Sequence, residues 1–275
     1  MRNYDVIVLG AGAAGMMAAI EAGKRGRSVL VVDHAKAPGE KIRISGGGRC
    51  NFTNTQTRPD RFISKNPKFA VSALSRYTPE RFTNLVRTYG VSFHEKTLGQ
   101  LFCDGSSAQV VNLLTSEMNK AGVTLELAAG IEAVEKADPG YVVRLASGPV
   151  SATSLVIATG GKSIPRMGAT GLGYRLAEQF GLKLVETRPA LVPLTFEPRI
   201  LEHLAPLAGI STEAVVTANG KGFREALLFT HRGLSGPAIL QVSSYWREGD
   251  PVAVRLLPDA DVMALLKQAR STTPK

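Results

Sequence analysis

The chain has 275 residues, of which 44% are hydrophobic, and its formal net charge is +10. This composition suffices for one large domain or two modest ones, but no stretch approaches the roughly 20 consecutive apolar residues of a membrane-spanning helix. The N-terminus lacks the pattern of a signal peptide, and two cysteines are too few for a disulfide framework, so we expect a cytoplasmic protein with no membrane partner.

The positive charge bears on the choice of partner. Basic surfaces suit nucleic acids or anionic lipids. Here the lysines and arginines are scattered along the chain, and no block of five or six like charges occurs. We therefore expect a general preference for small anionic ligands, and we do not expect specific nucleic-acid binding.

The first predicted elements form a βαβ unit. Residues 4–9 (YDVIVL) have the continuous apolar character of a buried parallel strand. A glycine-rich turn follows, and then come a helix over residues 16–26 and a second buried strand over residues 28–33. The whole unit fits within the first 33 residues.

The turn of this unit has the spacing of a dinucleotide-binding fingerprint. Gly10 allows the tight turn after the strand, Gly12 lets the backbone approach a pyrophosphate, and Gly15 lets helix and strand pack closely. The phosphates would bind amide groups at the start of the helix, near Ala13. Asp33, at the end of the second strand, would accept hydrogen bonds from a ribose diol and repel a 2′-phosphate. The fingerprint therefore predicts NAD or FAD rather than NADP.

Later elements favour FAD. The sequence predicts helices over residues 58–90 and 106–122, and a small β-meander over residues 131–158 that ends in a buried strand. Thr159 and Gly160 follow that strand, and their small size would let its end lie close to the nucleotide loop. NAD dehydrogenases commonly continue their sheet with further βα units. An interposed helical region and meander is typical of flavoproteins.

The composition changes near residues 189–193. Beyond them the sequence predicts a hairpin that turns at Asn219-Gly220. The elements expected after the hairpin are a helix over residues 236–249, a strand over 251–257 and a helix over 259–270.

The segment ISGGGRCNFTN, residues 44–54, is too rich in glycine for a helix or a central strand. Consecutive glycines expose backbone N–H groups that can bind an anion, and Lys41, Arg43 and Arg49 add positive charge. Asn51 can donate from its amide. We interpret the segment as part of the cofactor site. The alternative is a structural loop whose arginine pairs with a carboxylate.

Two residues are weak candidates for catalysis. Cys50 lies beside a basic residue and could be a reactive thiol, but Cys103 is far away in the sequence, and we favour a small packing residue. His231, in the sequence THRGLSGP, could act as a general acid or base, or could simply bond to backbone. No cluster has the spacing of metal ligands, so we expect no metal and leave the catalytic residues unassigned.

Four segments carry a resemblance to a known family: DVIVLGAGAAGMMAA, SGGGRCNFTN, IATGG and LFTHRGLSGPAILQVSS. Together they resemble the aminoacetone oxidase-like family of bacterial FAD-binding proteins, within the two-dinucleotide-binding-domain flavoproteins. The resemblance implies an α/β fold, with a Rossmann-like FAD-binding doubly wound sheet and a β-meander over residues 1–190. It also implies part of an α+β insert domain over residues 191–275.

The resemblance further implies FAD as cofactor, with residues 41–51 along the pyrophosphate and near the flavin ring. The residues expected to bind the cofactor are Gly10, Gly12, Ala13, Ala14, Gly15, Asp33, His34, Lys41, Ser45, Gly46, Gly47, Arg49, Cys50, Asn51, Ile131, Thr159 and Gly160.

The implied activity is that of an FAD-dependent oxidoreductase, which transfers a hydride between NAD(P)H or a small organic substrate and FAD. Two alternatives stay open: a flavoprotein that acts on tRNA, and a nucleotide-binding protein without turnover. Family chains continue past this end with a segment that closes over the flavin. On that ground we expect these 275 residues to bind FAD weakly, to associate and to turn over no substrate.

Overall fold

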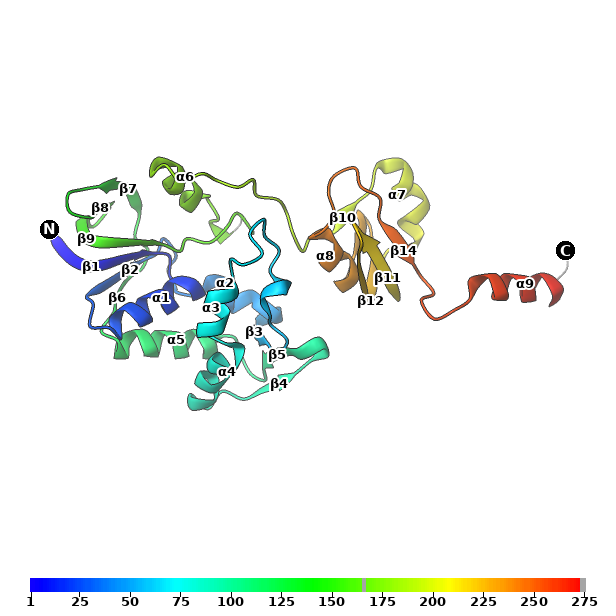
Figure 1. The fold of residues 1–275 in the computed structure, drawn as a ribbon, viewed down its shortest axis with the longest axis horizontal. Coiled ribbons are helices and arrows are strands. Elements are labelled where there is room, and N and C mark those ends of the chain that lie inside the picture. The colour runs from blue at the N-terminus through cyan, green and yellow to red at the C-terminus, as the bar shows by residue number, and fades with distance from the viewer. Residues whose placement is uncertain (165–166, 273–275) are drawn as a thin grey trace. The chain divides into compact units, whose positions relative to one another are not determined.

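The structure is a computed structural model that describes residues 1–164 and 167–272. The chain divides into two compact units, Met1–Leu184 and Val185–Lys275 (Figure 1). Each unit has its own hydrophobic core. The assignment of residues 1–190 to an FAD-binding domain and of the rest to an insert domain stays a prediction. Within the described ranges, no helix is long and apolar enough to cross a membrane.

A six-stranded sheet forms the centre of the first unit, with its strands in the order β6-β2-β1-β9-β8-β7. β1 pairs in parallel with both β2 and β9, and β2 pairs in parallel with β6. β7, β8 and β9 form the predicted antiparallel meander. The strands are β1 (Arg2–Leu9), β2 (Val29–Val32), β6 (Thr124–Glu126), β7 (Ile131–Lys136), β8 (Tyr141–Leu145) and β9 (Gly148–Ile157). Because parallel strands end at one edge of a sheet, the carboxyl ends of β1, β2 and β9 lie together.

Helices cover both faces of this sheet (Figure 1). On one face, Val8 of the sheet packs with Met16 and Leu114 from two helices. On the other face, Ile7 belongs to a core that includes Leu176. The helices are α1 (Ala13–Gly23) and α5 (Ala108–Lys120) on the first face and α6 (Leu172–Gln179) on the second. The predicted α/β class, with a doubly wound sheet and a β-meander, is confirmed.

The region between β2 and α5 differs from the prediction. Residues 58–90 form two short α-helices, α3 and α4, instead of helix throughout, and the region also contains α2 and a three-stranded antiparallel sheet, β3-β5-β4. Prolines break the helical pattern: Pro59 starts a single 3₁₀ turn, Pro67 lies in the exposed run before α3, and Pro79 starts α4. The elements are α2 (Glu40–Ile44), β3 (Asn51–Asn54), α3 (Val71–Arg76), α4 (Pro79–Thr88), β4 (Phe93–Glu95) and β5 (Gln100–Cys103).

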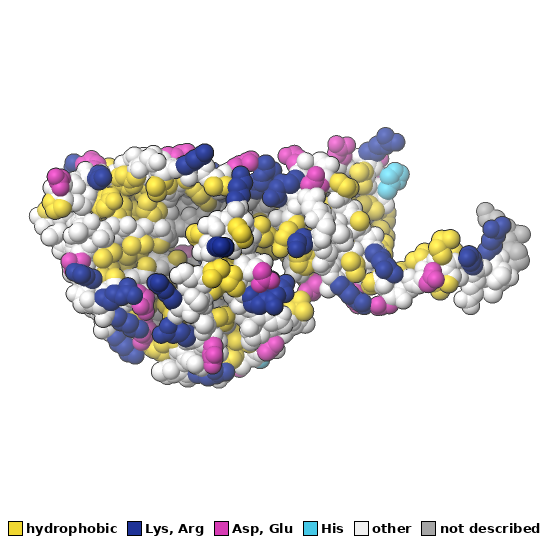
Figure 2. All heavy atoms as spheres, in the orientation of Figure 1, with side chains coloured by type: hydrophobic (Ala, Val, Ile, Leu, Met, Phe, Trp, Pro, Cys, Tyr) yellow, Lys and Arg dark blue, Asp and Glu magenta, His cyan; other side chains and the backbone are white. Residues whose placement is uncertain are grey.

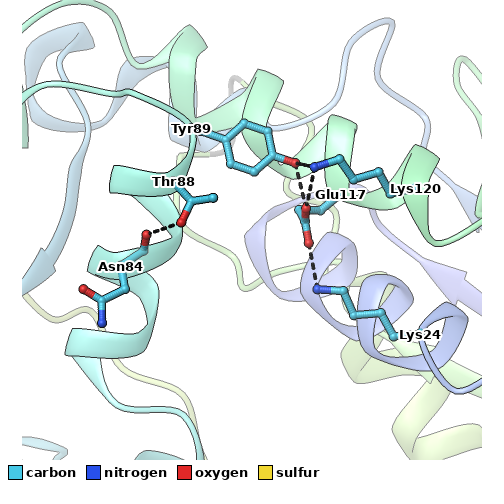
Figure 3. A network of polar contacts seen from close by, with 6 residues as sticks. All are labelled: Lys24, Asn84, Thr88, Tyr89, Glu117 and Lys120. Atoms are coloured by element: carbon cyan, nitrogen blue, oxygen red, sulfur yellow. Dashed lines mark hydrogen bonds and ion pairs between the residues drawn. The ribbon is translucent and has the colours of Figure 1, made fainter.

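A polar network around Glu117 ties α1, α4 and α5 together (Figure 3). Lys24 donates to Glu117 Oε2 at 2.7 Å, and the Tyr89 hydroxyl donates to Oε1 at 2.7 Å. Lys120 donates to Oε1 at 3.3 Å and to the Tyr89 oxygen at 2.8 Å. These hydrogen bonds, that from Lys24 above all, lower the pKa of the buried Glu117 carboxyl to about 2. The network therefore fixes α1, the helix that follows the fingerprint turn.

The second unit contains a five-stranded antiparallel sheet in the order β10-β13-β12-β11-β14. The predicted hairpin turns at Asn219 and Gly220, both with positive φ, as a type I′ turn requires. The helix expected over residues 236–249 is shorter in the structure, where α8 ends at Ser243. The elements are β10 (Leu194–Thr195), α7 (Pro198–Leu204), β11 (Ser211–Ala218), β12 (Lys221–Thr230), β13 (Gly233–Ser235), α8 (Pro237–Ser243), β14 (Ala253–Arg255) and α9 (Val262–Thr272).

Candidate dinucleotide site

The fingerprint turn joins β1 to α1, and its three glycines have different surroundings. A side chain at Gly10, where φ is +108°, would meet the Ala158 carbonyl oxygen, and one at Gly15 would meet the Gly10 carbonyl oxygen. These two glycines serve packing. Nothing lies within 4 Å of the position of a Cβ at Gly12, although its φ of −80° suits any residue. The missing side chain at Gly12 thus leaves open space at the start of α1, which suits a phosphate.

Ala13 and Ala14 form the first turn of α1 and are exposed beside this space. Their side chains are too small to cover the backbone amides at the helix N-terminus. The positive end of the helix dipole is therefore accessible to an anion. These residues fit the pyrophosphate of a dinucleotide.

Asp33 follows β2 and holds the turn in place. Its Oδ2 accepts from the Ala11 amide at 2.6 Å, and its Oδ1 accepts from the Ala35 amide at 2.8 Å. His34 Nδ1 lies 3.1 Å from Oδ1. Since a carboxylate has about four acceptor positions, Asp33 can still accept from ribose hydroxyls. The ribose contact stays a prediction from the sequence, and sequence reasoning missed the structural role of Asp33 in fixing the turn.

The loop after β9 approaches from the other side of β1. The Ala158 amide donates to the Leu9 carbonyl at 2.8 Å, which brings Thr159 and Gly160 next to the fingerprint turn. Lys41 reaches across from α2 and donates to Ser163 Oγ at 2.9 Å. A cation is thereby brought to the carboxyl edge of the sheet. Ile131, at the start of β7, is half-buried in the core on the α6 face.

The predicted glycine segment forms a 3₁₀ turn over Ser45–Gly48, with positive φ at all three glycines. A side chain at Gly46 would lie 2.8 Å from the Asn51 amide nitrogen, so this glycine is required by packing. At Gly47 and Gly48, nothing lies within 4 Å of a Cβ position. The Ser107 amide anchors the turn by donating to the Gly48 carbonyl at 2.7 Å. The turn thus presents bare backbone that a planar group can approach closely.

Polar side chains surround this turn. Ser45 Oγ donates to the Ile42 carbonyl at 2.7 Å, so its hydroxyl is used within the loop. Arg49 and Asn51 are exposed on either side of the buried Cys50. Arg49 therefore keeps its charge at the surface of the site, as the sequence predicts for an anionic ligand.

The two cysteines, far apart in the sequence, lie close together at one end of the β3–β5 pair. The Cys103 amide donates to the Arg49 carbonyl at 3.0 Å, and both thiols are buried in one core. Burial raises the pKa of Cys50, and burial together with the neighbouring Cys50 raises the pKa of Cys103 to about 11. Both are protonated thiols at neutral pH, which agrees with a packing role.

His231 lies in the turn between β12 and β13 of the second unit and is exposed. The neighbouring Arg232 amide donates to Thr230 Oγ1 at 3.3 Å, which shapes this turn. A catalytic role for His231 stays a prediction. Among the described residues, no group of three His, Cys, Asp or Glu side chains could hold a metal ion.

Comparisons with a family model and with individual proteins point to the same family. The chain matches the description "HI0933-like protein Rossmann domain" over residues 4–237. It is 50% identical over 275 residues to the ribosomal RNA dihydrouridine synthase of Escherichia coli (strain K12), covering 100% of this chain and 69% of that protein. It is 44% identical over 281 residues to the enzyme of the same name from Haemophilus influenzae (strain ATCC 51907), covering 100% of this chain and 70% of that protein.

A solved structure supports the fold alone. The open conformation of a flavocytochrome c3 fumarate reductase aligns with a TM-score of 0.52 at 20% identity, over 77% of this chain and 47% of that chain.

These relatives correct one expectation. Specific nucleic-acid binding was not expected from the scattered charges, but two relatives that match the whole chain are named for a ribosomal RNA substrate. The charge criterion was wrong because it asked only for consecutive like charges, whereas a surface collects charges from separate positions.

The family expectation is confirmed in its broader part, a flavoprotein oxidoreductase with FAD as cofactor, and not in its narrower label of aminoacetone oxidase. The open space at Gly12, the remaining acceptor capacity of Asp33 and the bare turn at Gly47 and Gly48 all fit FAD. The chain belongs to the HI0933-like family of FAD-dependent Rossmann-fold oxidoreductases.

Proposed function

We propose that the chain reduces a uridine of ribosomal RNA to dihydrouridine, with FAD as cofactor and NAD(P)H as the source of electrons. The similarity to ribosomal RNA dihydrouridine synthase along the entire chain, at 50% identity, carries this proposal. It replaces two expectations from the sequence: the small organic substrate, and the absence of turnover by these 275 residues. It also keeps the nucleic-acid alternative, with ribosomal RNA in place of tRNA.

The reaction reduces the C5–C6 double bond of the uracil ring. A hydride adds to C6, a proton adds to C5, and negative charge develops on the carbonyl conjugated to that bond. Bound FAD, once reduced, supplies the hydride. The work of the protein is to hold the cofactor, admit the base and stabilise the developing charge.

The residues of the first unit divide this work. The amides of Ala13 and Ala14 and the space at Gly12 would hold the pyrophosphate, while Asp33 would hold the ribose. The bare backbone of Gly47 and Gly48 would lie along the ring. The exposed guanidinium of Arg49 would add positive charge where charge develops on the uracil.

NAD(P)H would approach the flavin directly. The sequence has the fingerprint at Gly10–Gly15 and no second G-x-G-x-x-G after residue 160, so a separate nicotinamide domain is not expected in these residues. This supports reduction of the flavin and of the base at one site, in alternation.

The test is to incubate the purified chain with FAD, NADPH and unmodified ribosomal RNA, and to analyse the digested nucleosides by mass spectrometry. We expect dihydrouridine, and none with a Gly12→Glu variant that cannot hold FAD. The proposal fails if the FAD-loaded chain is reduced by NADPH and produces no dihydrouridine.

A further inference from the structure

We propose that residues 58–76 form a binding surface for single-stranded RNA, next to the flavin site. This inference rests on the proposed function and names the part of the chain that holds the substrate. The region, called here the basic segment, lies between β3 and α4 and contains α3.

The basic segment is exposed to an unusual degree. Residues 61–69 are all exposed and have no helix or strand after Arg61, and the chain is buried again at Ala70. Its exposed residues include large apolar side chains: Phe62 is 47% exposed and Phe69 is 77% exposed. Two uncovered rings within eight residues are unusual for a solvated loop and are typical of an interaction site.

The charges of the basic segment select the partner. It carries five cations and one acid: Arg58, Arg61, Lys65, Lys68, Arg76 and Asp60. Arg58 pairs with Asp60 at 3.0 Å, and among the described residues the other four cations make no ion pair. Aromatic rings interspersed with unpaired cations suit a polyanion whose bases can stack, which is a single-stranded nucleic acid.

The position of the basic segment fits the proposed reaction. β3 and residues 55–57 lead from the glycine turn to the segment, so Gly48 and Arg58 are ten residues apart along the chain, at most about 33 Å at roughly 3.3 Å per residue. An RNA strand held on the segment could therefore extend over a few nucleotides to the bare backbone of Gly47 and Gly48. That arrangement would present one base to the flavin while neighbouring bases stack on Phe62 and Phe69.

Both ends of the segment meet at an open pocket of about 260 Å³. Thr55 and Thr57 line it before the segment, and Thr78 and Thr83 line it after. Glu80 also lines this pocket, so the phosphates would follow the cations of the segment rather than enter it. The segment is thus a loop whose two ends lie close together, and its exposed side chains can be changed without disturbing the core.

The test measures binding to a uridine-rich single-stranded RNA by fluorescence anisotropy, with FAD present and no reductant. We expect Phe62→Ala with Phe69→Ala, which removes two stacking rings, to weaken binding by about 30-fold or more. Lys65→Gln with Lys68→Gln should weaken it and reduce the slope of log affinity against log salt by about 1.4. The charge-matched control, Lys136→Gln with Lys183→Gln, removes two exposed cations outside the segment and should stay within about twofold of the parent.

The outcomes separate the two proposals. If the parent binds RNA and the segment variants bind equally well, this inference is wrong while the proposed function stands. If the parent binds no RNA, the proposed function fails and this inference fails with it. Lowered melting temperatures with unchanged RNA affinity would show that the rings pack against protein. Tighter binding to phosphatidylserine vesicles than to RNA would show a membrane surface instead. Either result overturns the inference.

Discussion

At the scale of single residues, two fingerprint glycines are packed against backbone and the third faces open space. Gly10 and Gly15 touch backbone atoms of their neighbours, so a side chain there has no room. Gly12 has an ordinary φ and free space, so nothing in the protein explains its lack of a side chain. A bound pyrophosphate would occupy that space, and a matched pair of substitutions tests this prediction.

We predict that Gly12→Glu abolishes FAD binding while the chain stays folded, because the new carboxylate enters open space and repels the pyrophosphate. Gly15→Ala should instead destabilise the fold, since its methyl group meets the Gly10 carbonyl. Circular dichroism melting and FAD fluorescence titration measure both effects. A folded Gly12→Glu variant that binds FAD as tightly as the parent would show that the pyrophosphate lies elsewhere.

Asp33 has two roles, and removing it should show both. Asp33→Ala leaves the Ala11 and Ala35 amides without their acceptor, so we expect a loss of about 1–3 kcal/mol in the stability of the FAD-free chain. The lost ribose contact should weaken FAD binding by a similar amount. Denaturant unfolding without FAD and a separate FAD titration distinguish the two losses. An unchanged FAD affinity would remove Asp33 from the ribose site.

At the scale of elements, long and strongly patterned segments could be predicted, and short ones could not. The βαβ unit, the meander and the hairpin follow from buried apolar runs and from turn residues such as Asn219-Gly220. The three-stranded sheet was missed because its strands have only three or four residues each. Its stability comes from contacts distant in sequence, such as the edge-to-face pair of Phe52 and Phe82, whose centroids lie 6.0 Å apart.

The Glu117 network, which joins three helices, predicts an acid-sensitive fold. The pKa of the Glu117 carboxyl is about 2 in the folded chain, below its ordinary value of 4.5. The ionised carboxylate therefore contributes its full stabilisation above about pH 4.5. That contribution is lost as the pH falls from about 4.5 to about 2. We expect Glu117→Gln to lower the free energy of unfolding at pH 7 by about 1–3 kcal/mol and to flatten its pH dependence in this window.

The control is Glu135→Gln, which breaks the exposed Arg144–Glu135 ion pair and should cost little. Urea unfolding at a series of pH values measures both variants. Equal pH dependence of the parent and Glu117→Gln would contradict the role of the network.

At the scale of the whole molecule, composition and charge spacing gave the wrong prediction that specific nucleic-acid binding is not expected. Lysine and arginine side chains are dispersed over the face shown in Figure 2, in agreement with the scattered sequence. The basic segment nevertheless combines unpaired cations with exposed rings. The sequence predicts a cofactor site from its glycine spacing, because glycine lets a ligand approach the backbone, and the residues assigned to that site stay a prediction. It could not show that Cys50 and Cys103 are neighbours, or that Asp33 bonds the turn, because these depend on tertiary contacts.

The most direct test of the central claim is a single-turnover experiment without oxygen. The chain is loaded with FAD, and the flavin is reduced until its absorbance no longer changes. The reduced protein is then mixed with unmodified ribosomal RNA while the flavin absorbance is followed. We predict that the flavin reoxidises and that dihydrouridine appears in the RNA in equal amount. A flavin that stays reduced in the presence of bound RNA, and yields no dihydrouridine, would contradict the account.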